Sequence, residues 1–144
     1  MQGLGFVGEV GEEDVRATAD GAAERLAQVP AFDVSLGPAI VTPEALLLTV
    51  APEDGVRAVR SAIREAVGEV WGEVPEAADG FRPHVSVAYS NADGPAGPVA
   101  AALGTVTSSV TARIASAELI VLNRDNRMYE WETSRSVPLG KDDR

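Results

Sequence analysis

The chain has 144 residues, 45% of them hydrophobic, so it is long enough to bury the core of one globular domain. Its net charge of −10 argues against general binding to duplex nucleic acid. The lack of cysteine excludes disulfides, a thiol nucleophile and a cysteine-ligated metal. We find no signal-like start and no apolar run of membrane-spanning length, so we expect a soluble, cytoplasmic protein with no membrane partner.

The first part of the chain predicts the end of a strand, a helix and a strand. Residues 1–6 are apolar but short, which is typical of a strand end. An acidic first turn favours a helix over residues 12–29, whose apolar residues recur at helical spacing up to Pro30. Alternating apolar residues predict a half-buried strand over 32–36 that breaks at Gly37-Pro38.

The middle of the chain predicts a buried strand and a second helix. Residues 45–50 are almost all apolar, which is typical of a central strand covered on both faces. Pro52 and the acidic residues after it favour the start of a helix with an apolar stripe over residues 56–70. We expect the arginines of this helix to lie towards water, at positions 57, 60 and 64. Residues 72–80 then form a loop.

The strand predicted over residues 81–90 contains the only histidine of the chain. In a regular strand His84, Ser86 and Ala88 share one face, with neighbours on that face about 6.5 to 7 Å apart. An imidazole and a hydroxyl therefore lie side by side, and the small Ala88 leaves room next to them. The same alternation places Tyr89 on the opposite face, which favours a position in the core.

The last part of the chain predicts a short helix and a hairpin. The helix covers residues 99–103 and ends at Gly104. Residues 110–122 are strand-like and form either two strands or one long bent strand. A turn over 123–126 leads to a return strand over 128–137.

These elements predict the α+β class, with helices packed against a mostly antiparallel sheet. We assign residues 1–138 to one domain. Residues 139–144 are expected to form a frayed polar tail.

The stretch Pro83-His84-Val85-Ser86-Val87 resembles the second His-x-Thr/Ser motif of the 2H phosphoesterase superfamily, the 2′-5′ RNA ligase-like proteins. The similarity extends to residues 75–81, 89–91, 119–125 and 128–131, so it covers nearly the whole chain. It implies a pseudo-twofold fold with two lobes of mostly antiparallel sheet, helices on the outer faces and a central cleft.

The sequence departs from this pattern at its start. In such proteins a first His-x-Thr motif precedes a stretch like residues 2–6, and this sequence begins at that point. We therefore expect a truncated first strand and only the second half-site. A start site placed too late or a trimmed N-terminus, a true variant with half a site, and completion by a second protomer stay open, as does the oligomeric state.

The resemblance implies metal-independent hydrolysis, or reversible ligation, of a 2′,3′-cyclic phosphate or a 2′-5′ phosphodiester, with no cofactor. Its implied partner is a nucleotide or RNA-end phosphate. His84 is implied as a general acid or base, because imidazole changes protonation near neutral pH. Ser86 is implied as a donor to a non-bridging phosphate oxygen. The step that His84 serves and the direction of the reaction stay open.

Other polar and aromatic residues have two interpretations each. Arg82 is a candidate for phosphate binding or a solvated edge residue. Tyr89 is a candidate substrate contact, with core packing as the competing interpretation. Tyr129 and Trp131 could stack on a base, but aromatic residues on a sheet are more often packing. Two arginines flank the predicted turn and could serve only to keep it solvated, Arg124 and Arg127.

Two other classes of function compete with an enzyme. A non-catalytic nucleotide- or phosphate-binding module, or an inactive fragment, is consistent with a single histidine. A domain whose partner is another protein would be favoured if the face that carries His84 were packed under other side chains.

Overall fold

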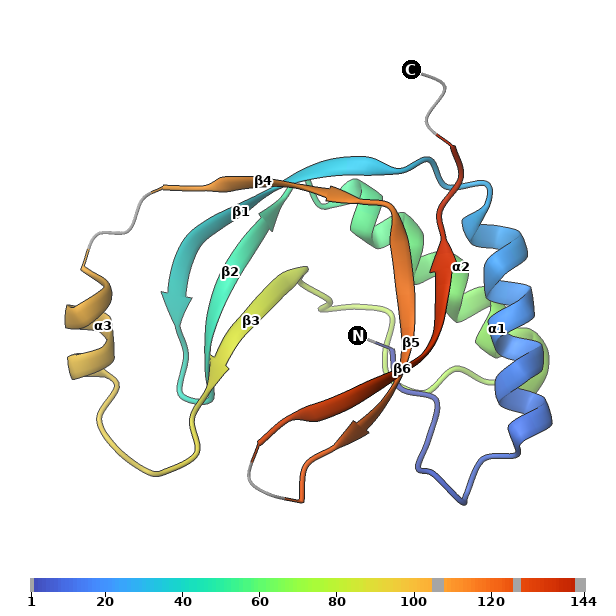
Figure 1. Ribbon diagram of the computed structural model, residues 1–144, viewed down its shortest axis with the longest axis horizontal. Helices are drawn as coiled ribbons and strands as arrows, with labels where there is room; N and C mark the ends of the chain where they lie inside the picture. The colour runs from blue at the N-terminus through green and yellow to red at the C-terminus, as the bar shows by residue number, and fades with distance from the viewer. Residues whose placement is uncertain (1, 105–107, 126–127, 142–144) are drawn as a thin grey trace.

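The computed structural model describes residues 2–104, 108–125 and 128–141, and its α+β class confirms the prediction (Figure 1). The elements, in chain order, are α1 (Glu12–Leu26), β1 (Phe32–Val41), β2 (Ala45–Ala51), α2 (Asp54–Trp71), β3 (His84–Tyr89), α3 (Gly97–Leu103), β4 (Val110–Ile114), β5 (Ser116–Asn123) and β6 (Glu130–Pro138). In the described part of the chain no helix is both long and apolar enough to span a membrane.

Four strands form one antiparallel sheet in the order β3-β2-β1-β4. The predicted break at Gly37-Pro38 is wrong, because β1 continues through this pair to Val41. The register between β1 and β2 shifts between Leu36 and Ala39 instead. Such an irregularity accommodates a proline without an N–H, and Gly37 tolerates the positive φ of 121° found there.

The second sheet consists of β5 and β6. The strand-like stretch over 110–122 is therefore two strands in different sheets, separated by Ala115. In Figure 1 β1, β2 and β3 lie to the left of β5 and β6, and β4 crosses the top of the view and leads directly into β5. The turn predicted between β5 and β6 includes Asn126, which lies outside the described residues.

Helices α1 and α2 pack on each other, α1 also packs against β6, and α3 lies beside β1 (Figure 1). The predicted stripe of α1 is confirmed by its buried residues, among them Ala22 and Leu26, although the helix ends at Leu26 rather than at 29. On α2 the most buried residues are Ala62, Ala66 and Val67. Alanines at a helix contact let the two backbones approach closely.

The expectation of a frayed tail is wrong for its first two residues. Leu139 is 8% exposed and belongs to the core formed by α1, α2 and β6. Gly140 N–H donates to the carbonyls of Leu26 (3.0 Å) and Val29 (2.8 Å). Those carbonyls belong to the last residue of α1 and to the turn after it, and carbonyls at a helix end need donors, so the chain after β6 is fixed there. Residues 142–144 of the predicted tail lie outside the described residues.

The N-terminal residues also differ from expectation, because residues 2–6 are not part of a strand. They lie instead against the loop that follows α2. The Gln2 side-chain amide donates to the Pro75 carbonyl at 3.0 Å, and Gly3 N–H donates to the Glu76 carboxylate at 3.3 Å.

Candidate functional site

The two predicted catalytic residues lie on β3, the edge strand of the four-stranded sheet. His84 pairs with Thr49 of β2 and Ser86 pairs with Leu47. Thr49 and Leu47 are two residues apart on β2, so their partners share one face of the sheet, as predicted. His84 is exposed and Ser86 is half-buried. The imidazole is therefore not packed inside the core.

A β-bulge near the C-terminal end of β3 changes which residues lie on this face. The register between β2 and β3 shifts after Ser86, so that Ala88 pairs with Leu46 and Tyr89 pairs with Ala45. The extra residue is Val87, which is 51% exposed. Because a bulge shifts the alternation by one residue, Tyr89 joins the face of His84 and Ala88 leaves it. The predicted positions of Tyr89 and Ala88 are both wrong.

We call this surface the His84 face. The strand register defines its members: Ala45, Leu47, Thr49, His84, Ser86 and Tyr89. Tyr89 is 44% exposed, which also contradicts a core position. No turn residue or glycine in the sequence around Val87 signals a bulge; only the pairing of β3 with β2 shows it.

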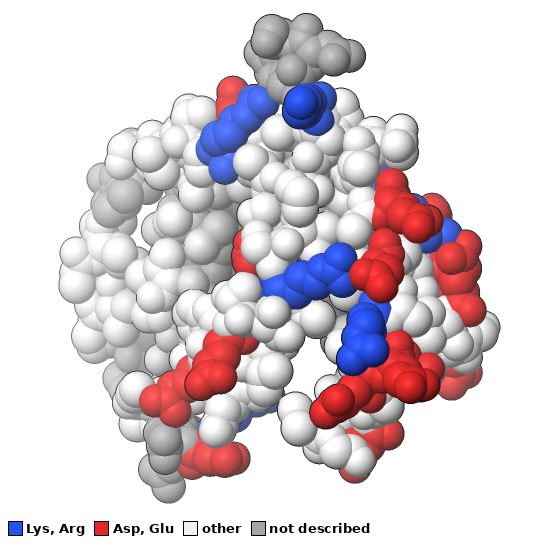
Figure 2. Space-filling view, turned by 45° about the vertical axis from the view of Figure 1, so that its right-hand side comes forward, with Lys and Arg blue, Asp and Glu red and all other residues white. Residues whose placement is uncertain are grey.

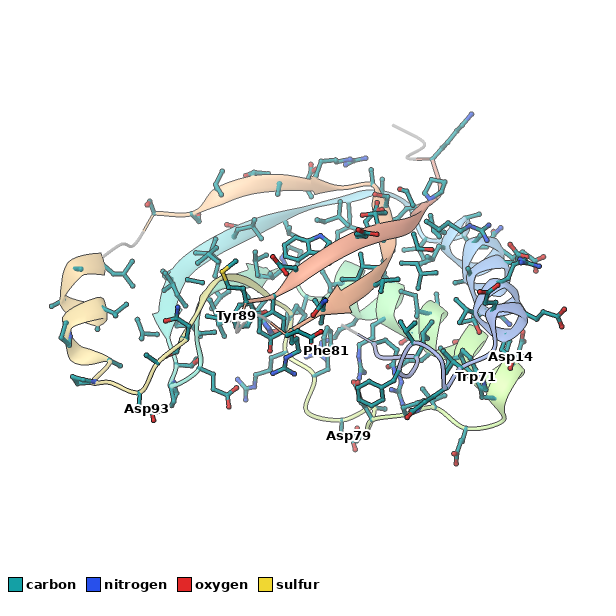
Figure 3. All side chains as sticks on the ribbon, turned by 60° about the horizontal axis from the view of Figure 1, so that its bottom comes forward. Asp14, Trp71, Asp79, Phe81, Tyr89 and Asp93 are labelled. Atoms are coloured by element: carbon teal, nitrogen blue, oxygen red, sulfur yellow. The ribbon has the colours of Figure 1, made fainter. Side chains whose placement is uncertain are left out.

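The His84 face turns towards the second sheet at Tyr89. The ring of Tyr89 stacks on that of Tyr129, with centroids 4.1 Å apart and planes 28° from parallel. Figure 3 shows Tyr89 next to the end of the β5–β6 hairpin. Trp131, which was expected to pack on its sheet, is 62% exposed. Arg127, the second arginine of the predicted turn, lies outside the described residues.

A hydrogen bond determines which ring nitrogen of His84 carries the hydrogen. Its Nδ1 lies 2.9 Å from the carbonyl oxygen of Arg82. A carbonyl can only accept, so Nδ1 carries the hydrogen and Nε2 is the nitrogen that can exchange a proton with a ligand. Arg82 itself is exposed, and its backbone carbonyl is the group that contacts His84.

The loop that leads into β3 is held by arginines of α2. Arg60 donates to the carbonyls of Ala77 and Ala78, both at 3.2 Å, and its guanidinium carbon lies 4.5 Å from the ring centre of Phe81. Arg64 donates to the carbonyls of Pro75 (3.2 Å) and Glu76 (3.1 Å). The expectation that these arginines lie simply towards water is therefore wrong. No local pattern signals these hydrogen bonds, because they join the helix to residues 11 to 18 positions further along the chain.

Replacing Arg64 with methionine is expected to lower the free energy of unfolding by about 1–3 kcal/mol, because hydrogen bonds from a charged donor are lost. Hydrogen exchange over residues 75–80 should also become faster. Urea unfolding and mass spectrometry measure both effects. The matched variant Arg16→Met, at an exposed position of α1, should change stability by less than about 0.5 kcal/mol. Equal effects of the two variants would contradict the role of Arg64.

Acidic side chains are prominent on the surface. Figure 2 shows them concentrated on the right-hand side of the view, with basic side chains between them, and a second group at the lower left. Arg25 of α1 pairs with Glu65 and Glu69 of α2, and Arg135 of β6 pairs with Asp20 of α1 at 2.6 Å. Among the described residues no group of three or more acidic or histidine side chains is placed to hold a metal ion.

Comparison with protein families gives one match over most of the chain. The family model of the 2'-5' RNA ligase superfamily matches residues 6–126. No curated protein sequence matches the chain.

Several solved structures share the fold. TT0787 of Thermus thermophilus is 20% identical, with a TM-score of 0.64 over 96% of this chain and 77% of that one. A protein described as a phosphoesterase is 14% identical, with a TM-score of 0.61 over 96% of this chain and 75% of that one. LigT of E. coli in its apo form is also 14% identical, with a TM-score of 0.61 over 96% of this chain and 74% of that one. At these identities the similarity shows the fold alone.

Proposed function

Because the chain belongs to the 2′-5′ RNA ligase superfamily, we propose that it binds a nucleotide or RNA-end phosphate on the His84 face and acts on a 2′,3′-cyclic phosphate or a 2′-5′ phosphodiester. The observation that carries the proposal is the placement of His84 and Ser86. An imidazole with Nε2 available and a hydroxyl lie next to each other on an edge strand, and neither is covered by the core.

The chemistry of such a bond fits these two groups. Hydrolysis joins a water oxygen to phosphorus and breaks the bond to the leaving ribose oxygen. One proton leaves the water and one reaches the leaving oxygen, so the net change is the addition of one water. His84 Nε2 is suited to one of these transfers. Ser86 is suited to donate to a non-bridging oxygen, where negative charge increases in the transition state.

Ser86→Ala tests the phosphate contact. It is expected to lower turnover of a 2′,3′-cyclic nucleotide by about 10²-fold, the usual effect of removing one donor to a developing negative charge. It should also weaken binding of the product, a nucleoside 2′- or 3′-monophosphate. Chromatography of the products and calorimetry measure the two effects.

Ser116→Ala is the matched control, because Ser116 also lies on a strand but its hydroxyl donates to Glu118 on the second sheet. It should leave turnover and binding unchanged. Equal effects of the two variants, or none from Ser86→Ala, would contradict the proposed role of Ser86.

A second candidate is a nucleotide-binding module that does not turn over its ligand, because an exposed imidazole and a half-buried hydroxyl can bind a phosphate without transferring a proton. Both candidates expect a nucleoside monophosphate to bind, and both expect Ser86→Ala to weaken it. Only the enzyme converts the cyclic nucleotide at a rate that depends on His84. Binding without conversion would support the module, and the absence of binding would contradict both candidates.

A further inference from the structure

A pocket of about 690 Å³ lies where segments of both sheets meet. It is lined by Pro43 and Glu44 of the turn between β1 and β2, by Tyr89 at the end of β3 and residues 90–93 after it, and by Arg124, Met128 and Tyr129 of the β5–β6 hairpin. Its volume is within the range of small-molecule sites. We call it the hairpin pocket. Tyr89 connects it to the His84 face, because this residue belongs to both.

Three planar groups lie together in the hairpin pocket. Tyr129 stacks on Tyr89, and the guanidinium carbon of Arg124 lies 4.8 Å from the ring centre of Tyr129. Tyr89 has the Tyr129 ring on one side and is still 44% exposed. We call this exposed side of the ring the free face of Tyr89.

The wall of the hairpin pocket is held in place by hydrogen bonds. Ser90 N–H donates to the Glu44 carbonyl at 2.8 Å, and the Ser90 hydroxyl donates to the Ala92 carbonyl at 2.8 Å. These bonds fix the segment after β3 on the turn between β1 and β2. The free face of Tyr89 is thus presented by a backbone that is already ordered before a ligand binds.

The charges that line the hairpin pocket disfavour a phosphate there. Glu44 and Asp93 contribute two carboxylates, against one guanidinium from Arg124. A neutral ring with N–H groups suits this surface better than an anion does, because carboxylates accept hydrogen bonds from base amino groups. Because of the bulge at Val87, Ser86 and Tyr89 pair with Leu47 and Ala45, which are two residues and about 6.5 to 7 Å apart on β2, so two parts of one ligand can bind at the two places.

Resting on the function proposed above, we propose that the hairpin pocket binds the base of the nucleotide whose phosphate lies against His84 and Ser86, with the free face of Tyr89 as the stacking platform. Tyr129 supports this platform from behind. Bases of single-stranded nucleic acid bind aromatic side chains in this way, with little dependence on sequence. The substrate class is therefore a nucleotide with an unpaired base, rather than any small phosphate ester.

Two ligands that differ only in the base test this inference. The dissociation constants of adenosine 2′-monophosphate and ribose 2-phosphate are measured by calorimetry. The unsubstituted protein is expected to bind the nucleotide about 5- to 100-fold more tightly, the range of one stacked base. Tyr89→Leu should reduce this preference to less than about 2-fold while ribose 2-phosphate binds as before. The matched variant Tyr89→Phe retains a planar ring and should retain the preference.

Tyr129→Leu provides a second variant if Tyr89→Leu does not fold, and it should also reduce the preference, because the platform loses its support. Equal binding of the two ligands by the unsubstituted protein, or a preference that survives loss of the Tyr89 ring, would overturn the base site alone. Failure of both ligands to bind, or affinities that Ser86→Ala leaves unchanged, would instead overturn the proposed function and this inference with it.

Discussion

Replacing His84 with glutamine is expected to lower kcat for hydrolysis of a 2′,3′-cyclic nucleotide by about 10²- to 10⁴-fold, the usual contribution of a general acid or base. Glutamine is similar in size, and its amide N–H can still donate to the Arg82 carbonyl that holds the imidazole at 2.9 Å. It cannot exchange a proton near neutral pH. The variant therefore removes the proton transfer and leaves most of the local structure.

The same variant should separate catalysis from binding. Affinity for the product nucleotide is expected to change much less than kcat, because the Ser86 hydroxyl remains on the same face. Stopped assays and calorimetry measure the two quantities, and an unchanged melting temperature serves as the control for folding. Unchanged kcat would contradict the assignment of His84.

Replacing Leu139 with alanine is expected to lower the free energy of unfolding by about 2–4 kcal/mol, the cost of removing a buried leucine side chain and leaving a cavity. Leu139 lies in the core with Leu26, Ala66 and Val137, and its N–H donates to the Ala115 carbonyl at 2.9 Å. A residue of a frayed tail would show almost no effect. Denaturant unfolding distinguishes the two cases.

Two alanine variants calibrate this measurement. Leu26→Ala, at a side chain that is 1% exposed in the same core, should cost at least as much as Leu139→Ala. Val99→Ala, at a side chain of α3 that is 48% exposed, should change stability by less than about 0.5 kcal/mol. If Leu139→Ala lowers the free energy of unfolding as little as Val99→Ala does, this would contradict the position of Leu139 in the core.

The change of sheet at Ala115 shows which features of a strand a local sequence pattern can predict. The stretch over 110–122 is uniformly strand-like, so it predicts extended backbone, and this is confirmed. The allocation of β4 to one sheet and β5 to the other depends on their partners, β1 and β6, which lie far away in the sequence. Alternation along a strand contains no information about which distant strand pairs with it.

Local sequence patterns were sufficient to predict the helices, the α+β class and the adjacency of His84 and Ser86. These features depend on residues a few positions apart, where helical and strand periodicity hold. Three-dimensional pairing was needed to show that Tyr89 joins the His84 face, because the bulge at Val87 arises from pairing with β2. It was also needed to show that Arg60 and Arg64 hold a loop and that Leu139 is buried. Each of these features depends on a contact with another segment of the chain. A pattern within one segment therefore has no physical basis for predicting such a contact.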